Sequence, residues 1–163
     1  MIILGVDPGL QNTGFAVLDA EKKLCKILQF GLIKTNRTQP FEKRLKTIYD
    51  QLCKIIEQYH FNVVVLEEIF YAQNVKVALK MSHVRGVTLL AAANYLIPTA
   101  EYSPREIKQA VTGNGNASKY QVQQMIRMIL KLPSTPSNFD ITDAMAVAYC
   151  HSQRVIFSES IRN

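Results

Sequence analysis

Residues 1–14 read MIILGVDPGLQNTG, in which an apolar stretch runs directly into an aspartate. The apolar residues within 2–6 predict a strand that is buried on both faces. The next pair, Pro8 and Gly9, suits the central positions of a type II turn. An aspartate at the end of a strand is often only a turn residue, because its side chain bonds to the backbone two residues on. Asp7 therefore becomes a functional candidate only if the fold brings other acids to the same place.

The rest of the chain predicts an α/β fold. Three strands joined by short polar turns come first and predict an antiparallel meander. Helices and two more strands follow, and the apolar run NVVVL of the fourth strand is typical of the centre of a covered sheet. We therefore expect one domain over residues 1–163, with a mixed five-stranded sheet flanked by helices. The expected strands are residues 2–7, 13–19, 24–35, 62–70 and 97–103, and the expected helices are residues 41–59, 75–96, 104–112, 118–133 and 139–153.

Composition narrows the class of protein only slightly. The 163 residues are 48% hydrophobic and 20% charged, with a formal net charge of +6. An excess of positive charge favours a polyanionic partner such as nucleic acid, although basic proteins need not bind one. Cys25, Cys53 and Cys150 are odd in number and widely spaced, which argues for a reducing compartment and against a disulfide framework or a zinc site. With neither a signal-peptide pattern nor a stretch long enough to span a membrane, the sequence predicts a cytoplasmic protein.

Further acids end or enter apolar segments. The fourth strand runs into Glu67 and Glu68, and the last helix carries Asp140 and Asp143 as its only Asp, Glu, Lys or Arg residues before Gln153. The i, i+3 spacing places both aspartates on one face of that helix. Ligands of α/β proteins usually bind beyond the carboxyl ends of the buried strands, so these acids are expected to meet Asp7 there.

A divalent cation is the simplest explanation for such a cluster. Two carboxylates 4 Å apart repel by roughly 4 kcal/mol at an effective dielectric constant of 20, and the sequence offers no obvious buried basic partner for four of them. Mg²⁺ binds carboxylate oxygens and keeps water molecules for a phosphate substrate. Each acid also has an ordinary explanation: Asp140 as a helix N-cap, Asp143 as a first-turn acid, and Glu68 as a solvated strand end. The coincidence of four acids favours the metal site.

Several blocks of sequence together resemble the RuvC family of Holliday-junction resolvases. The blocks are ILGVDPGLQNTGFAV, LEEIFYAQN, ALKMSHVRGV, REIKQAVTGNGNASKYQVQQMI and FDITDAMAVAYCH, in that order. The resemblance spans the chain from Ile2 to about His151. It implies a ribonuclease-H-like fold and a homodimer that cuts four-way DNA junctions with two symmetric nicks, in recombination and repair.

The resemblance also assigns residues. It places the catalytic and metal-binding acids at Asp7, Glu67, Asp140 and Asp143. These are expected to hold two Mg²⁺ ions per site, which Mn²⁺ could replace. It points to Lys108 and Lys119 as DNA contacts, and to Phe70 as an aromatic that could stack on a base or fold back into the core. It favours Glu67 over Glu68 as the ligand, which strand parity alone leaves open. Residues 81–90 of the long apolar helix are the candidate dimer interface, and the RuvA–RuvB branch-migration complex is the implied partner.

Two other classes of protein deserve comparison. A sugar-kinase or actin-like ATPase also begins with an Asp-x-Gly turn, but it needs a second glycine-rich phosphate loop and usually a longer chain. A junction- or RNA-binding module without catalysis would keep the fold and the positive charge. Such a module gains nothing from a carboxylate cluster, because the cluster repels phosphate.

Overall fold

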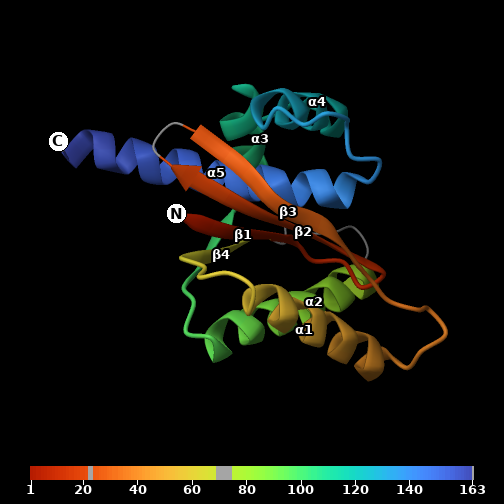
Figure 1. Ribbon diagram of the computed structural model, residues 1–163. Helices are drawn as coiled ribbons and strands as arrows, with labels where there is room; N and C mark the ends of the chain where they lie inside the picture. The colour runs from red at the N-terminus through yellow and green to blue at the C-terminus, as the bar shows by residue number, and fades with distance from the viewer. Residues whose placement is uncertain (22–23, 69–74, 163) are drawn as a thin grey trace.

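The computed structural model describes residues 1–21, 24–68 and 75–162. Within these ranges it has five strands and five helices (Figure 1). The strands are β1 (Ile2–Asp7), β2 (Asn12–Glu21), β3 (Leu24–Lys34), β4 (Val63–Glu67) and β5 (Thr99–Tyr102), and the helices are α1 (Phe41–Ile56), α2 (Val75–Asn94), α3 (Pro104–Thr112), α4 (Lys119–Ile129) and α5 (Phe139–Arg162). The order of elements along the chain is the one that the sequence predicts.

The strands form one mixed sheet in the order β3-β2-β1-β4-β5. β1 pairs with β2 and β2 with β3 in antiparallel fashion, while β4 is parallel to both β1 and β5. The meander and the parallel extension are therefore confirmed. Because β1 and β4 are parallel neighbours, their carboxyl ends lie at the same edge of the sheet.

Helices cover both faces of the sheet (Figure 1). α5 lies across β1 and β2, with α3 and α4 packed beside it, and α1 and α2 cover the opposite face. The strands alternate between two apolar cores: Val65 belongs to the core under α5, whereas Leu66 belongs to the core under α1 and α2. Among the described residues, we find no helix with the length and apolarity needed to cross a membrane.

α5 lies unusually close to the sheet because the strands carry glycine under it. A Cβ atom on Gly5 would collide with the backbone of Ala144, and one on Gly14 would collide with the backbone of Asp140. The missing side chains therefore bring the first turns of α5 directly against β1 and β2.

The turn after Asp7 differs from the prediction. A type II turn requires a positive φ at its third residue, but among the described glycines only Gly113 has one. The Pro8–Gly9 segment is instead closed by the hydroxyl of Thr13, which donates a hydrogen bond to the Gly9 carbonyl oxygen at 2.7 Å. A side chain therefore closes the turn, and Gly9 does not need the left-handed conformation.

Several other elements also end at other residues than predicted. α1 stops at residue 56 rather than 59, α2 at 94 rather than 96, and β5 spans only 99–102 of the predicted 97–103. α4 ends at Ile129 rather than at Pro133, because Lys131 takes a positive φ and the Leu132 amide turns back to the Arg127 carbonyl at 2.9 Å. α5 continues beyond residue 153 to Arg162, since no glycine or proline interrupts the sequence there. β4 ends at Glu67, and the remainder of its predicted range runs into residues outside the described ones.

Candidate active site

A cleft of about 380 Å³ opens where β1 and β4 end and α5 begins. It lies at the edge of the sheet to which the carboxyl ends of both strands point. All four predicted acids line it, together with Glu68, Lys119 and several neutral residues. The lining consists of Asp7, Pro8, Gly9, Asn12, Glu67, Glu68, Met81, Pro104, Lys119, Asp140 and Asp143.

The four acids are held there by three elements. Asp7 and Glu67 are the last residues of β1 and β4. Asp140 lies in the first turn of α5, where the backbone of the helix packs on Gly14. The side chain of Asn138 caps this helix by accepting a hydrogen bond from the Asp140 amide at 2.7 Å. Asp140 is therefore not needed as the N-cap, and its carboxylate can face the cleft.

Burial, together with the charge of neighbouring acids, raises the pKa of three of the carboxyl groups. Burial, followed by the charges of Asp143, Glu67 and Asp140, raises the pKa of Asp7 to about 7. Burial and the charge of Asp143 also raise the pKa of Glu67. The pKa of Asp143 is raised mainly by burial, against the lowering effect of Lys119. The carboxylates therefore form one electrostatically coupled group that the protein compensates only in part.

Lys119 supplies part of that compensation. Its ammonium group donates a hydrogen bond to Asp143 Oδ2 at 3.0 Å. The residue is the first of α4, and the predicted capping box between Ser118 and Gln121 is present immediately around it. Lys108, on α3, lines a small adjoining hollow with Lys119, Glu67 and Asp143. Both lysines predicted to contact DNA thus lie beside the acidic cluster.

The donor chemistry of the cleft suits a divalent cation. Hard cations such as Mg²⁺ bind carboxylate oxygens, and a cation would relieve the repulsion that raises the pKa of Asp7. As they stand, the described His, Cys, Asp and Glu side chains form no group of three close enough to hold an ion. The carboxylates thus provide the right atoms and charge without a finished coordination shell.

The two adjacent glutamates differ in their environment. Leu66 faces the core under α1 and α2, so the alternation of a strand turns the Glu67 side chain toward α5 and the aspartates. The backbone amide of Glu68 already donates to the Tyr102 carbonyl oxygen at 2.9 Å, beyond the end of β4. This geometry favours Glu67 as the member of the cluster. Phe70 lies outside the described residues.

Sequence reasoning missed Asn12 and Met81, which also line the cleft. Asn12 is the first residue of β2 and follows the turn after Asp7. Its position close to Asp7 in the sequence was the available signal that it could line the same site. Met81 gave no signal, because a methionine in an apolar helix is indistinguishable from a core residue.

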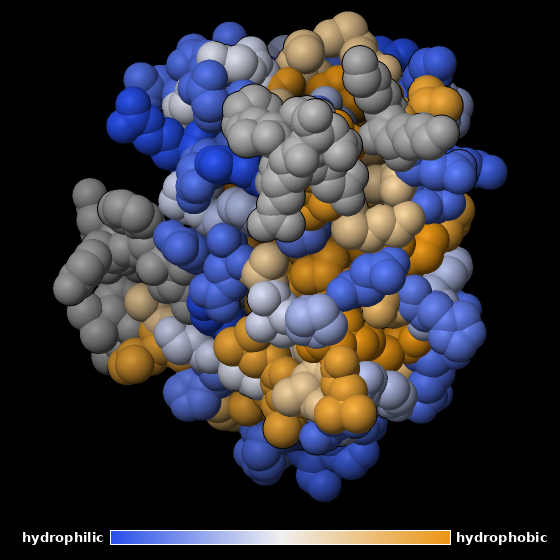
Figure 2. Space-filling view, turned by 90° about the vertical axis from the view of Figure 1, so that its left-hand side faces the viewer, coloured by the Kyte–Doolittle hydropathy of each residue, from blue (hydrophilic) through white to orange (hydrophobic). Residues whose placement is uncertain are grey.

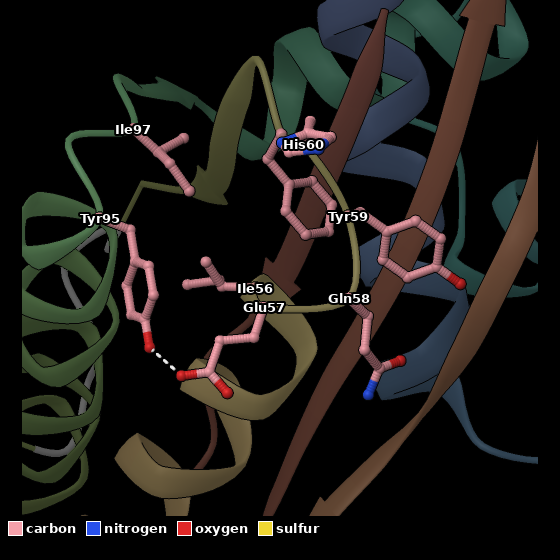
Figure 3. Close-up of a pocket in the computed structure, with 8 residues that line it drawn as sticks. Ile56, Glu57, Gln58, Tyr59, His60, Tyr95 and Ile97 are labelled. Atoms are coloured by element: carbon pink, nitrogen blue, oxygen red, sulfur yellow. Dashed lines mark hydrogen bonds between the residues drawn. The ribbon is translucent and has the colours of Figure 1, made fainter.

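The opposite end of the sheet carries a different kind of surface. Figure 2 shows this end of the molecule, with apolar residues gathered on the lower half, which is the layer of α1 and α2. A pocket of about 340 Å³ lies there between the end of α1 and the segment after α2 (Figure 3). Among the described residues that line it, Glu57 is the one carboxylate, and it accepts a hydrogen bond from the Tyr95 hydroxyl. The pocket therefore lacks the acidic cluster of the first cleft.

The model of the family described as "Crossover junction endodeoxyribonuclease RuvC" matches residues 3–151 of the chain. The chain belongs to the RuvC family. The match includes all four acids of the cleft and both lysines beside them. The family membership suggested by the sequence blocks is confirmed, and with it the class of endodeoxyribonuclease.

Individual RuvC proteins are similar over nearly the whole chain. The RuvC of Alkaliphilus oremlandii is 44% identical over 162 residues, which cover 99% of each chain. That of Syntrophotalea carbinolica is 45% identical over 152 residues, with 93% of this chain and 94% of the relative covered. The structure of Thermus thermophilus RuvC in complex with a Holliday junction substrate superimposes with a TM-score of 0.92 at 28% identity, covering 97% of this chain and 96% of that one. This similarity confirms the predicted ribonuclease-H-like α/β fold.

Proposed function

We propose that this protein is an endonuclease that resolves four-way DNA junctions by paired symmetric nicks, with Mg²⁺ bound by the acidic cluster. One observation carries the proposal: Asp7, Glu67, Asp140 and Asp143 meet in one cleft of a chain that belongs to the RuvC family. The net charge of +6 suits a DNA substrate. The T. thermophilus relative was solved with a Holliday junction.

The reaction is hydrolysis of a phosphodiester. A water molecule attacks phosphorus in line with the departing 3′ oxygen, so that the P–O3′ bond breaks as the new P–O bond forms. Two divalent cations, when bound, activate the water and stabilise the leaving oxygen. Asp7 would hold both ions because it is central in the cluster, Glu67 and Asp140 would hold one each, and Asp143 would complete the group. Mn²⁺ could replace Mg²⁺.

The lysines beside the cluster are assigned to the DNA backbone. Lys119 stands at the first turn of α4, where its ammonium group and the helix amides favour a phosphate. Lys108 lies at the adjoining hollow, where its charge offsets part of the rise in the pKa of Glu67 and of Asp143. Both lysines can therefore bind a phosphate beside the acids and offset the repulsion between the phosphate and the carboxylates. Phe70 remains a predicted base-stacking residue.

A homodimer is proposed through the exposed face of α2. Leu79, Ser82, Gly86 and Leu90 recur at steps of three and four residues and are all exposed, whereas Val84 and Thr88 face the core. Among the described residues, apart from its chain neighbours and the adjacent turns of its own helix, none comes within 4 Å of a Cβ added to Gly86. A glycine inside an exposed helix costs stability, so its position favours the close approach of a second chain.

The test is cleavage of a synthetic four-way junction in Mg²⁺ by the wild-type protein and by Asp7→Asn. We expect paired nicks at symmetric positions from the wild-type protein and a loss of about 10³-fold or more in Asp7→Asn, with junction binding retained. Asp50→Asn is the matched control, because Asp50 lies on α1 and pairs with Lys46. This control should cleave like the wild-type protein.

Other outcomes identify other functions. Junction binding without cleavage by the wild-type protein would indicate a binding module, and equal cleavage of plain duplex would exclude junction selectivity. Association with RuvA–RuvB is a further proposal from family resemblance, to be tested by co-sedimentation on junction DNA.

A further inference from the structure

Arg85 of α2 holds the carboxyl end of β4 from the side opposite the acidic cluster. Its Nη1 donates a hydrogen bond to the backbone carbonyl oxygen of Glu67 at 3.1 Å. Its Nη2 forms an ion pair with the carboxylate of Glu101. The Arg85 side chain is only 18% exposed. One guanidinium group therefore joins α2, the last peptide of β4, and β5.

The peptide between Glu67 and Glu68 is held by the sheet on one side only, where the Glu68 amide donates to the Tyr102 carbonyl oxygen of β5. The paired register of β1 and β4 stops at Val6 and Leu66, one residue before Glu67. The Glu67 carbonyl thus lies beyond that ladder, and Arg85 supplies a donor for it. An unpaired carbonyl in a partly buried position is unfavourable, so this contact favours one orientation of the terminal peptide.

Glu101 fixes the direction of the guanidinium. It stands opposite Leu66 in the register of β4 and β5, and Leu66 faces the core under α1 and α2. Its carboxylate therefore lies on the α2 side of the sheet, whereas the Glu67 side chain turns to the α5 side. A planar guanidinium held by a carboxylate loses little further freedom when it also binds a carbonyl.

Arg85 does not act on the acids as a nearby charge. Burial and the charge of Asp143 raise the pKa of Glu67, and the charges of Lys119 and Lys108 lower it. Arg85 also does not line the acidic cleft. Its influence on the Glu67 carboxylate therefore passes through the backbone.

We propose that Arg85, oriented by Glu101, is a positioning residue that fixes the last peptide of β4 and so aims the Glu67 carboxylate at the metal-binding cluster. The proposal rests on the assignment of Glu67 as a metal ligand in the proposed function. It ties the geometry of the active site to α2, the helix proposed for the dimer interface.

The test uses a readout that needs no cleavage. The melting temperature of the full-length protein is measured without DNA as MgCl₂ is added. Because stabilisation grows as RT ln(1 + [Mg²⁺]/Kd) without a plateau, the data are fitted to this relation, and the fitted Kd is taken as the half-effect concentration, at which half of the sites are filled. In Arg85→Gln we expect this concentration to increase about tenfold, because the ligand is no longer held in place. Arg85→Lys should recover part of the loss, and Glu101→Gln should lie between the wild-type protein and Arg85→Gln.

Arg154→Gln is the matched control. Arg154 also forms an ion pair between two elements, from α5 to Glu106 of α3 at 2.8 Å, away from the cleft. It should leave the half-effect concentration of Mg²⁺ unchanged even if it lowers the melting temperature. In junction cleavage, Arg85→Gln should keep the junction affinity within about twofold, and added Mg²⁺ should restore its rate.

The outcomes distinguish a failure of this proposal from a failure of the proposed function. A wild-type protein that shows no Mg²⁺-induced rise overturns the metal site, and the positioning role with it. A normal rise in the wild-type protein with an unchanged half-effect concentration in Arg85→Gln overturns the positioning role alone. Equal effects of Arg85→Gln and Arg154→Gln would reveal general destabilisation and also overturn it.

Discussion

The carboxyl group of Asp7 lies where a buried strand ends among other acids, and this costs the folded protein stability. Its pKa in the folded protein is about 7, against an ordinary value of 3.8. Below about pH 4 the group is neutral in both the folded and the unfolded chain. Between about pH 4 and 7 only the unfolded chain ionises, so stability falls as the pH rises. The acidic cluster therefore opposes folding at neutral pH unless a cation binds.

Asp7→Asn should stabilise the protein in EDTA at pH 8, by an amount on the order of 2–4 kcal/mol. The gain should decline as the pH falls from 7 and vanish below about pH 4. Urea denaturation of both proteins at pH 4, 6 and 8 measures it. A gain that is the same at all three pH values would contradict the raised pKa. Asp50→Asn serves again as the control, and should show no comparable dependence on pH.

Lys119 binds the same carboxylate that a metal ion would use. Lys119→Met should therefore bind Mg²⁺ about two- to fivefold more tightly without DNA, since exposed ion pairs contribute only about 0.2–1 kcal/mol. It should nevertheless cleave the junction about tenfold more slowly or worse, because a phosphate contact is lost. Mg²⁺-induced melting shifts and single-turnover cleavage measure the two effects. Lys43→Met, at an exposed position of α1, should change neither Mg²⁺ binding nor the cleavage rate. Weaker Mg²⁺ binding by Lys119→Met would refute the idea that Lys119 and Mg²⁺ compete for the same carboxylate.

At the scale of elements, the sequence predicted what depends on periodicity and missed what depends on contacts between segments. The apolar repeats identified every strand and helix in order, and Ser118 and Gln121 marked the start of α4 correctly. The end of α4 was wrong because Lys131 carries no sequence signal for a positive φ. The link between Arg85 and Glu101 was invisible, since it joins elements whose proximity exists only once β4 and β5 have paired.

The same limits apply to the candidate site. Four acids and two lysines could be selected in advance because each stands out against apolar neighbours or within a family motif, and the fold brings all six to one cleft or its rim. Met81 was predicted only as part of the candidate dimer interface over residues 81–90, and the approach of α2 to the end of β4 is what places it at the cleft. Asn138 likewise had no functional signal, because its role depends on where α5 begins.

For α2, the decisive test is Gly86→Ala. In a monomeric state the substitution should stabilise the helix by about 1 kcal/mol, because alanine is the better helix former. If a second chain packs against Gly86, the added methyl group should weaken self-association about tenfold or more. Sedimentation equilibrium measures the dimer, and denaturation over a range of protein concentrations separates the two effects. Gln51→Ala, on the exposed side of α1, is the control and should leave self-association unchanged. An unchanged self-association in Gly86→Ala would show that this face of α2 contacts only solvent.

At the scale of the whole molecule, one cleft per chain can cut one strand, so two symmetric nicks require two chains. A heterodimer of wild-type and Asp7→Asn subunits should therefore nick a junction once and release few resolved duplexes. Purification through two different affinity tags isolates this species, and denaturing and native gels count nicks and resolved products. The wild-type protein carrying the same two tags is the control. Full resolution by the heterodimer would contradict one active site per strand.

The placement of the four acids along the chain has a consequence for protein synthesis. Asp7 and Glu67 leave the ribosome early, but Asp140 and Asp143 belong to α5, which packs against β1 and β2 from the far end of the sequence. A nascent chain, or one cut short before α5, lacks half of the cluster and also the helix that packs on β1 and β2. If the cluster is the nuclease site proposed above, cleavage requires α5, and incomplete products of translation carry no complete site.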